Sequence, residues 1–345
     1  MVGQKKNFFL EIYDTKYKYL MILSMLLLIF SLSVVGYKVI TTGEVINKGV
    51  SLKGGLKVTI VASQDVNTDE LQKHLRSKFT EADISVRSSS SFGSSTQNIE
   101  IEASDISAKE LISGVSEKIP EISLDPKDHN LQEVGPTFGD TFFVQTLKSI
   151  FIAFLFMSVV VYLYFGESLK FKWISSILSF VAGIMMFYAN NVITYTIPII
   201  IMVVLMVIYF KTNIPSFAII LCAFSDLFFS LAIFDLSGRT LSIGGVAAFL
   251  MLIGYSIDTD ILMSVRVLKR KEGTVNDRIV DAMKTGITMS LAALVAVLTA
   301  YFLSSSEVIK EIMFILSIGL VGDIIFTWIQ NAGVLRWHLE KKGWK

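Results

Sequence analysis

Long apolar runs separated by short polar segments make up most of the chain. A helix that crosses a bilayer needs about 20 predominantly apolar residues. By that measure the sequence predicts eight membrane spans, at roughly 20–40, 142–165, 173–189, 192–210, 214–235, 241–265, 286–303 and 312–334. A long polar lead precedes the first run and no small-residue cleavage site closes it, so we expect a retained helix and not a removable signal peptide.

Residues 41–141 form the one long polar interruption, and their pattern predicts a small domain. Strands are expected where apolar and polar residues alternate, and amphipathic helices where apolar residues recur at helical spacing. In chain order the expected elements are strand 56–62, helix 67–82, strands 83–88 and 98–103, helix 107–119 and a last strand at 131–135. The order βαββαβ is typical of a ferredoxin-like α+β domain.

The predicted fold class is therefore an α-helical polytopic membrane protein with a small ferredoxin-like domain outside the bilayer. The composition agrees, because 52% of the residues are hydrophobic, 18% are charged and the mean hydropathy is +0.60, which is too apolar for an ordinary soluble protein. We divide the chain into an N-terminal segment with the first span, the outer domain, the bundle and a C-terminal tail. Their limits are 1–40, 41–141, 142–335 and 336–345.

The distribution of Lys and Arg predicts the orientation, although the net charge of +1 says nothing about partners. With the N-terminus in the cytoplasm, the short loops on the opposite side hold only Arg239 and Lys310. Both termini are therefore expected in the cytoplasm, and residues 41–141 outside the plasma membrane. The basic residues on the cytoplasmic side are Lys5, Lys6, Lys16, Lys18, Lys170, Lys172, Lys211, Arg266, Lys269, Arg270, Lys271, Arg278, Lys284, Arg336, Lys341, Lys342 and Lys345.

Four carboxylates lie inside predicted spans, where each ionised Asp costs about 2.5–3.5 kcal/mol on insertion scales. They are Asp226, Asp258, Asp260 and Asp323. We expect them to face one another, water or a cation. Because desolvation disfavours the charged form of a carboxyl group, our hypothesis is that they load and release a proton near neutral pH. The alternative is that they only cap or hydrogen-bond neighbouring helices.

Helical geometry separates two of these acids, because residues two apart point about 200° away from each other. Asp258 continues a stripe of small residues, of the kind that lets another helix approach closely. Asp260 continues a hydroxyl stripe, which either lines a hydrated path or satisfies one buried acid. We rank Asp258 first as the proton carrier and Asp260 second. The small stripe is Gly244, Ala247 and Gly254, and the hydroxyl stripe is Ser256 and Ser264.

Other chemistry finds little support in the sequence. Lys284, at the cytoplasmic entry of the seventh span, is either a counter-charge for the acids or a snorkelling anchor. His74, His129 and His338 are isolated, and the single cysteine, Cys222, lies in a span, so neither a metal constellation nor a disulfide is predicted. No nucleophile elbow, dinucleotide fingerprint or HExxH motif is present, and “SLKGGLKV” lacks phosphate-loop spacing. We expect no enzyme, no cofactor and no nucleic-acid partner.

Several short sequence segments, taken in their order along the chain, resemble the motifs of one protein family. “GVSLKGGLKV” is similar to a Gly-x-Asp-Phe-x-Gly-Gly segment, without the Asp-Phe pair, and “VGPTFGD” precedes the second span. “AFSDLFFSLAIF” is similar to a His-Asp stretch, “IGYSIDTDILMSVR” to a Tyr-Ser-Ile-Asn-Asp-Thr run ending in Arg, and “AMKTGITMSLAAL” to an Arg-Thr-x-x-Thr-Ser opening. Together they resemble the SecF family, of archaeal type, the smaller partner in the RND-related SecD–SecF protein-export complex. The motif residues are Gly54, Gly55, Gly135, Pro136, Gly139, Tyr255, Ser256 and Arg266.

The resemblance covers most of the chain except about 166–210, and it implies a SecF/RND-like bundle of six spans. We therefore interpret the extra pair, about 173–210, as an inserted hairpin. Asp258 falls where the SecF pattern has Asn and the SecD pattern has its functional Asp, whereas Asp260 falls where SecF has Thr. Thr259 occupies the SecF acid position. Lys284 stands in place of the family's Arg and keeps the charge without the fork geometry.

The function that the resemblance implies is a subunit that uses the proton gradient to assist protein export through the Sec channel. Its partners would be a SecD-like membrane protein, the translocon channel, unfolded preprotein and membrane lipids. One alternative is a non-transducing accessory scaffold of the translocon. Another is an RND-type exporter of lipids or small molecules. The sequence does not distinguish a proton from a sodium ion.

Overall fold

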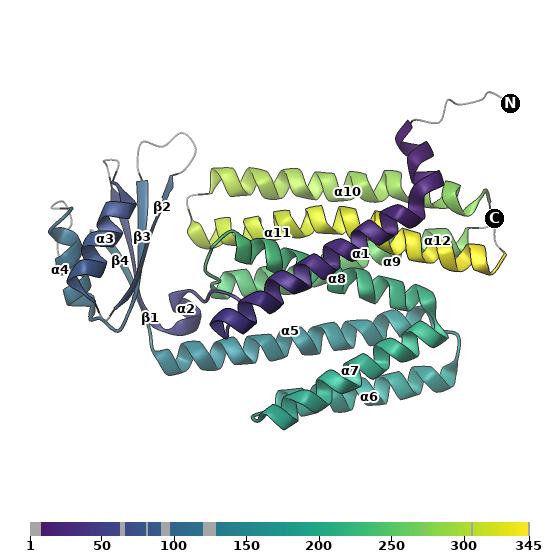
Figure 1. Cartoon of the computed structure of the whole chain (residues 1–345), viewed down its shortest axis with the longest axis horizontal. Coiled ribbons are helices and arrows are strands. Elements are labelled where there is room, and N and C mark those ends of the chain that lie inside the picture. Colours follow the sequence, from purple (N-terminus) through teal and green to yellow (C-terminus); the bar gives the residue numbers. More distant parts are fainter. Residues whose placement is uncertain are drawn as a thin grey trace.

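The computed structural model describes residues 8–62, 66–80, 82–90, 97–119, 129–270, 272–304 and 306–343. It shows a bundle of long helices with a small sheet domain at one end (Figure 1). The first and last described helices meet at the opposite end of the bundle. The predicted fold class, a polytopic helical membrane protein with a small α+β domain, is confirmed.

Within the described ranges, eight helices are long and apolar enough to cross a membrane, as predicted. The central helices α8 and α9 are the most deeply buried, because other spans surround them, whereas α10 exposes most of its surface. The spans are α1 (Phe8–Thr42), α5 (Pro136–Phe165), α6 (Leu169–Phe187), α7 (Val192–Thr212), α8 (Ile214–Leu236), α9 (Ile243–Lys269), α10 (Val275–Leu303) and α11 (Glu307–Ile325).

We expected the bundle to end at residue 335 and a tail to follow at 336–345, but the last helix continues to Lys341. After α11 the chain continues through a π-helix (Phe326–Asn331) into α12 (Ala332–Lys341). The helix is extended because Leu335 and Leu339 are buried. Arg336 also holds it in place, since its guanidinium lies 2.9 Å from the Asp14 carboxylate of α1 and 2.8 Å from that of Glu340.

The sheet domain follows α1 and a short helix, α2 (Val50–Lys53). Its strand order is β2-β3-β1-β4, antiparallel throughout, which is the order of a ferredoxin-like sheet. Asn67 caps the first of its two helices, because its side chain accepts hydrogen bonds from the amides of Asp69 and Glu70. The elements are β1 (Gly55–Ala62), α3 (Thr68–Lys78), β2 (Asp83–Ser90), β3 (Gln97–Ser104), α4 (Ala108–Ser116) and β4 (His129–Val134).

The two faces of this sheet differ in chemistry because side chains alternate along each strand. One face buries Val58, Ile60, Ile99 and Ile101 against α3 and α4. The other face is polar and is directed toward the end of the bundle (Figure 1). It carries Lys57, Arg87, Glu100 and Glu102.

The pair α6 and α7 forms an antiparallel hairpin that packs on α5 and α8, at the lower edge of the bundle in Figure 1. Tyr209 of α7 stacks on Tyr162 of α5 with ring centroids 4.5 Å apart, and its hydroxyl hydrogen-bonds Ser175 of α6. Asn191 caps α7. These elements lie where the hairpin was predicted, and its being an insertion stays a prediction.

Candidate functional site

Three of the four predicted intramembrane acids meet inside the bundle. Asp226 lies on α8, Asp260 on α9 and Asp323 on α11, and each is at most 1% exposed. These three helices pack against one another. Their packing therefore brings together carboxyl groups that are far apart in the sequence. This arrangement agrees with our expectation that buried acids face one another.

Thr327, on the π-helix, joins two of these acids. Its hydroxyl oxygen lies 2.9 Å from Oδ1 of Asp260 and 3.1 Å from Oδ1 of Asp323. A hydroxyl has one hydrogen, so it donates to only one carboxylate at a time. The second contact becomes a hydrogen bond when the other carboxyl group is protonated and donates to the threonine oxygen. The arrangement therefore suits a pair of acids that holds a proton.

Further donors surround the three carboxyl groups. Asn331 Nδ2 donates to Asp260 Oδ1 at 2.8 Å, Ser290 Oγ donates to Asp323 Oδ2 at 3.2 Å, and Ser256 donates to Asp226 Oδ2. Two oxygens remain, Oδ1 of Asp226 and Oδ2 of Asp260, which are buried and accept no hydrogen bond from the described residues. A buried polar atom without a partner is costly, so these oxygens are where a bound ion would be stabilised.

None of the hydrogen-bond or ion-pair partners of these acids, among the residues that the structure describes, is Lys, Arg or His. Three ionised carboxylates would place three like charges in a water-poor interior, which is strongly unfavourable. A carboxylate oxygen from each of Asp226 and Asp260 and the thiol of Cys222 all lie within 4.8 Å of one another. The oxygen donors of this site suit a proton or a small hard cation.

Asp258 does not join this cluster, and its ranking as the proton carrier stays a prediction. Its side chain is exposed on the surface of α9, while Asp260, two residues later, is buried. The two acids lie on opposite sides of α9, as the helical geometry predicts. The hydroxyl stripe faces the interior of the bundle, since Ser256 and Ser264 are both buried. In the stripe of small residues, a Cβ added at Gly254 would have no other residue within 4 Å, so the space beside Gly254 is open.

Lys284 is not a counter-charge for the buried acids. Its side chain is 72% exposed, and its ammonium lies 3.0 Å from the carboxylate of Asp281, one turn earlier on α10. A long side chain at a helix end keeps its charge in water, so the anchor interpretation agrees with the geometry. Arg266 also lies at this end of the bundle, where it donates to Thr285 at 2.7 Å.

The residues that the sequence reasoning missed lie mostly on the π-helix. It contributes Thr327 and Asn331 to Asp260, and Gln330 donates to Ser225 at 3.0 Å on α8. π-helical segments are frequent at functional sites because their wider turn redirects side chains. The signal in the sequence was “FTWIQN”, in which three side chains that form hydrogen bonds interrupt an apolar span.

The glycine motifs lie elsewhere and hold the sheet domain to the bundle. Gly54 and Gly55 have φ of 87° and 128°, which favour glycine, and they lead directly into β1. A Cβ at Gly139, on the first turn of α5, would lie 2.7 Å from the Gly54 amide, so the two motif segments pack against each other. Gly135 caps α5 and Pro136 is its first residue.

Comparison with known proteins agrees with this architecture. The family model “Protein export membrane protein SecD/SecF, C-terminal” matches residues 115–200 and 185–341. The protein-export membrane protein SecF of Pyrococcus furiosus is 31% identical over 303 residues, which cover 88% of this chain and 84% of that protein. SecF of Methanothermobacter thermautotrophicus is 32% identical over 306 residues, covering 86% and 85%. The chain belongs to the SecF family.

A solved structure supports the fold of this SecF-family chain. SecDF of Thermus thermophilus, described as a translocon-associated membrane protein, superposes with a TM-score of 0.60 at 18% identity. The likeness covers 98% of this chain and 39% of SecDF, so the chain spans about two fifths of that protein. The two stretches that match the family model overlap at residues 185–200, within the α6–α7 hairpin.

Proposed function

We propose that this chain is a SecF-type subunit that uses the proton gradient to assist protein export. The observation that carries the proposal is the cluster of Asp226, Asp260 and Asp323, which is buried and lacks a basic partner among the described residues. Membership of a family of protein-export membrane proteins supports an exported protein as the cargo. In this proposal the cargo is an unfolded preprotein that passes through the Sec channel.

The physical mechanism is a two-state bundle. When the cluster holds its protons, α8, α9 and α11 pack closely, and when a proton leaves, the uncompensated charge favours a different packing. Moving one charge through the membrane field is worth about 2.3 kcal/mol per 100 mV, which shifts a two-state equilibrium more than tenfold. One proton per cycle is therefore enough to move the sheet domain relative to the bundle.

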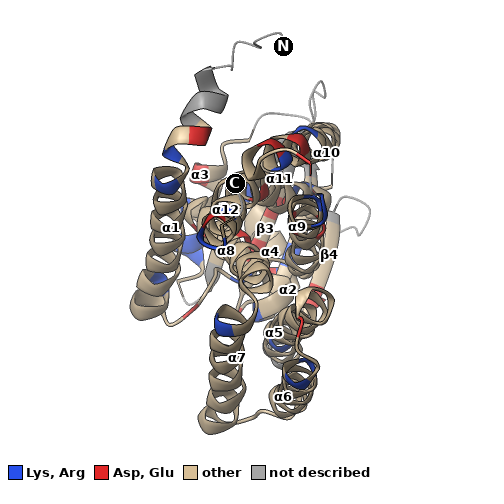
Figure 2. Cartoon of the chain, turned by 90° about the vertical axis from the view of Figure 1, so that its right-hand side faces the viewer, with Lys and Arg blue, Asp and Glu red and all other residues tan. Residues whose placement is uncertain are grey.

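The orientation that we propose puts both termini in the cytoplasm and the sheet domain outside the plasma membrane. Figure 2 looks onto the end of the bundle where α12 ends and shows basic residues at several helix ends. Among them are Lys211 in the last turn of α7 and Arg266 and Lys269 in the last turns of α9. Basic residues at that end support this orientation through the positive-inside rule.

A SecD-like membrane protein is the proposed partner, packed on the surface of α9 that carries Gly254 and Asp258. Both residues are exposed, and small residues let a second helix approach closely. In this arrangement Asp258 serves the interface, while Asp260, Asp226 and Asp323 carry the ion. Lipids cover the other apolar surfaces, such as those of α1 and α7.

The test compares two neighbouring acids in proteoliposomes that contain the chain and its SecD-like partner. Asp260→Asn should abolish proton flux and export while the complex still assembles. Asp258→Asn, the matched control two residues away, should keep proton flux. Equal proton flux and export in wild type and Asp260→Asn would leave only the scaffold role. Flux that follows sodium and not pH would replace the proton by Na⁺ at the same site.

A further inference from the structure

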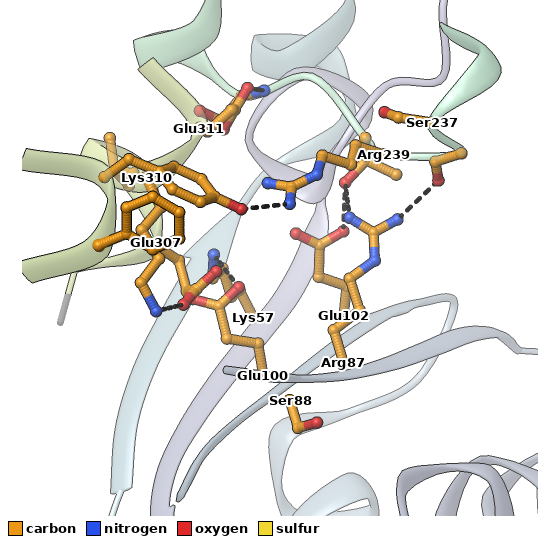
Figure 3. Close-up of a pocket in the computed structure, with 16 residues that line it drawn as sticks. Lys57, Arg87, Ser88, Glu100, Glu102, Ser237, Arg239, Glu307, Lys310 and Glu311 are labelled. Atoms are coloured by element: carbon orange, nitrogen blue, oxygen red, sulfur yellow. Dashed lines mark hydrogen bonds and ion pairs between the residues drawn. The ribbon is translucent and has the colours of Figure 1, made fainter. Parts of the chain in front are cut away.

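A charged cleft of about 660 Å³ separates the sheet domain from the bundle (Figure 3). The polar face of the sheet forms one wall. The loop between α8 and α9 and the neighbouring ends of α10 and α11 form the other. The charged side chains that line the cleft are Lys57, Arg87, Glu100, Glu102, Arg239, Glu307, Lys310 and Glu311. Four are basic and four are acidic, so the cleft offers both donors and acceptors.

Two arginines in the cleft are held by neutral groups. Arg87 of β2 donates to Thr240 Oγ1 at 2.9 Å and to the Gly238 carbonyl at 3.4 Å. Arg239 donates to the Tyr301 hydroxyl at 3.0 Å, and its guanidinium lies 4.2 Å from the ring centre of Phe314. Among the described residues neither has a carboxylate within ion-pair distance. A guanidinium has five N–H donors, so both retain donors for a ligand.

Acceptors lie beside these donors. The only hydrogen bond that the Glu102 carboxylate accepts from the described residues is a long one, 3.4 Å from the Thr240 hydroxyl. A peptide group carries one donor and one acceptor, so a wall that presents both matches a polypeptide backbone. A phosphate or an anionic lipid headgroup would need donors alone, and the four carboxylates oppose it. The volume lies within the range of ligand pockets, about 300–1,000 Å³, which admits a short extended segment and not a folded domain.

Part of the bundle wall of the cleft is directly connected to the three helices that hold the buried acids. The residues between α8 and α9 line it, and Glu311 of α11 accepts a hydrogen bond from the Ser242 amide at the start of α9, at 2.7 Å. Glu311 and Asp323 are on one helix, separated by about 18 Å along its axis. Any change in how these helices pack therefore changes this wall.

On one side the sheet wall joins the bundle through the packing of Gly54 on α5 and through backbone hydrogen bonds of the segment 47–49. The Leu241 amide donates to Asn47 at 2.7 Å, and Gly49 donates to Leu241 at 2.8 Å. On the other side, Arg87 donates to Gly238 and Thr240, and the Glu102 carboxylate accepts from Thr240. Widening the cleft on that side would therefore break three side-chain hydrogen bonds.

We propose that this cleft binds an extended segment of the exported polypeptide. Arg87 and Arg239 donate to its carbonyl or carboxylate oxygens, and Glu102 accepts from its amides. The inference rests on the proposed function for the identity of the cargo. The ion state of the buried acids then sets the width of the cleft, so that cargo is held in one state and released in the other.

The test places a photocross-linking side chain at Ser237, which is exposed and lines the cleft (Figure 3). The matched control is Ser113, exposed on α4 behind the sheet. With the chain, its SecD-like partner and an export preprotein arrested in transit, we expect cross-links to the preprotein from Ser237 and at least fivefold fewer from Ser113. Cross-links from Ser237 to lipid alone, to the partner alone, or to nothing would overturn the proposal.

A second measurement does not depend on arrest. A fluorescent 20-residue unfolded peptide of mixed charge should bind the purified complex, and the double change Arg87→Ala and Arg239→Ala should weaken binding at least fivefold. Unchanged peptide binding in this variant would refute the proposal that the cleft binds polypeptide. The two proposals fail separately, because normal proton flux in Asp260→Asn would remove the proposed function while the Ser237 cross-link still tests binding in the cleft.

Discussion

Replacing Thr327 by Val removes one hydroxyl from the centre of the acid cluster and leaves the side-chain shape almost unchanged. The hydroxyl contacts Oδ1 of Asp260 at 2.9 Å and Oδ1 of Asp323 at 3.1 Å. In the variant, Asp260 keeps Asn331 and Asp323 keeps Ser290 as donors. The change therefore alters the balance between protonated and ionised states without emptying the site.

The size of the change in proton affinity depends on whether the ionised or the protonated state loses more hydrogen-bond free energy in the variant. A hydrogen bond donated to an ionised carboxylate contributes about 1.5–3 kcal/mol, and one between neutral groups contributes about 1 kcal/mol. The ionised state thus loses about 0.5–2 kcal/mol more than the protonated state. Since about 1.36 kcal/mol corresponds to tenfold, we expect the Asp260–Asp323 pair to hold its proton about two- to thirtyfold more tightly.

The assay is an infrared titration of the purified complex in lipid nanodiscs, in which the protonated carboxyl band is followed against pH. Thr327→Val should move the midpoint of proton release upward by about 0.4–1.5 pH units. Thr146→Val, at a buried threonine of α5, is the control and should leave the midpoint in place. A midpoint that stays constant or falls in Thr327→Val would refute the role of the shared hydroxyl.

Three further predictions use other parts of the molecule. Gly286→Ala should destabilise the chain by about 1–3 kcal/mol in thermal unfolding, because its Cβ would lie 2.1 Å from the Trp328 ring. Gly254→Leu, with open space around it, should leave that unfolding unchanged and reduce co-purification of the SecD-like partner. Burial raises the pKa of Glu100, and Lys57 only partly offsets this. The wild type should therefore lose stability as pH rises above the ordinary glutamate range, and Glu100→Gln should remove that loss, measured by unfolding from about pH 4 to about pH 8.

The sheet domain was predictable because each strand carries its own signal. Alternation along β1 and β3 puts Val58 and Ile101 on one face and Lys57 and Glu100 on the other, whatever the neighbouring strands are. The spans were predictable for a similar reason, since the length of an apolar run is a local property. Local signals therefore determined which elements form.

The orientation of the helices was not predictable in the same way. A hydroxyl stripe and a small-residue stripe both suit a helix interface, so the sequence could place Asp258 and Asp260 on opposite sides but could not say which side is internal. The contact of Thr327 with Asp260 depends on the pairing of α9 with the π-helix, 67 residues away. The cleft depends on how the sheet docks on the bundle, which no local pattern encodes.

The buried acids and the cleft are connected through α11 and through the loop between α8 and α9, and thermodynamic linkage makes a quantitative prediction from this connection. If proton release changes the affinity of the cleft for polypeptide by some factor, saturating polypeptide must change the proton affinity of the acids by the same factor. The infrared midpoint should therefore shift when the 20-residue peptide is added, by one pH unit for each tenfold pH-dependent change in peptide binding. Arg87→Ala together with Arg239→Ala should abolish that shift while keeping the midpoint of the free complex. If peptide binding depends on pH but the infrared midpoint does not change when peptide is added, groups other than Asp226, Asp260 and Asp323 control the cleft.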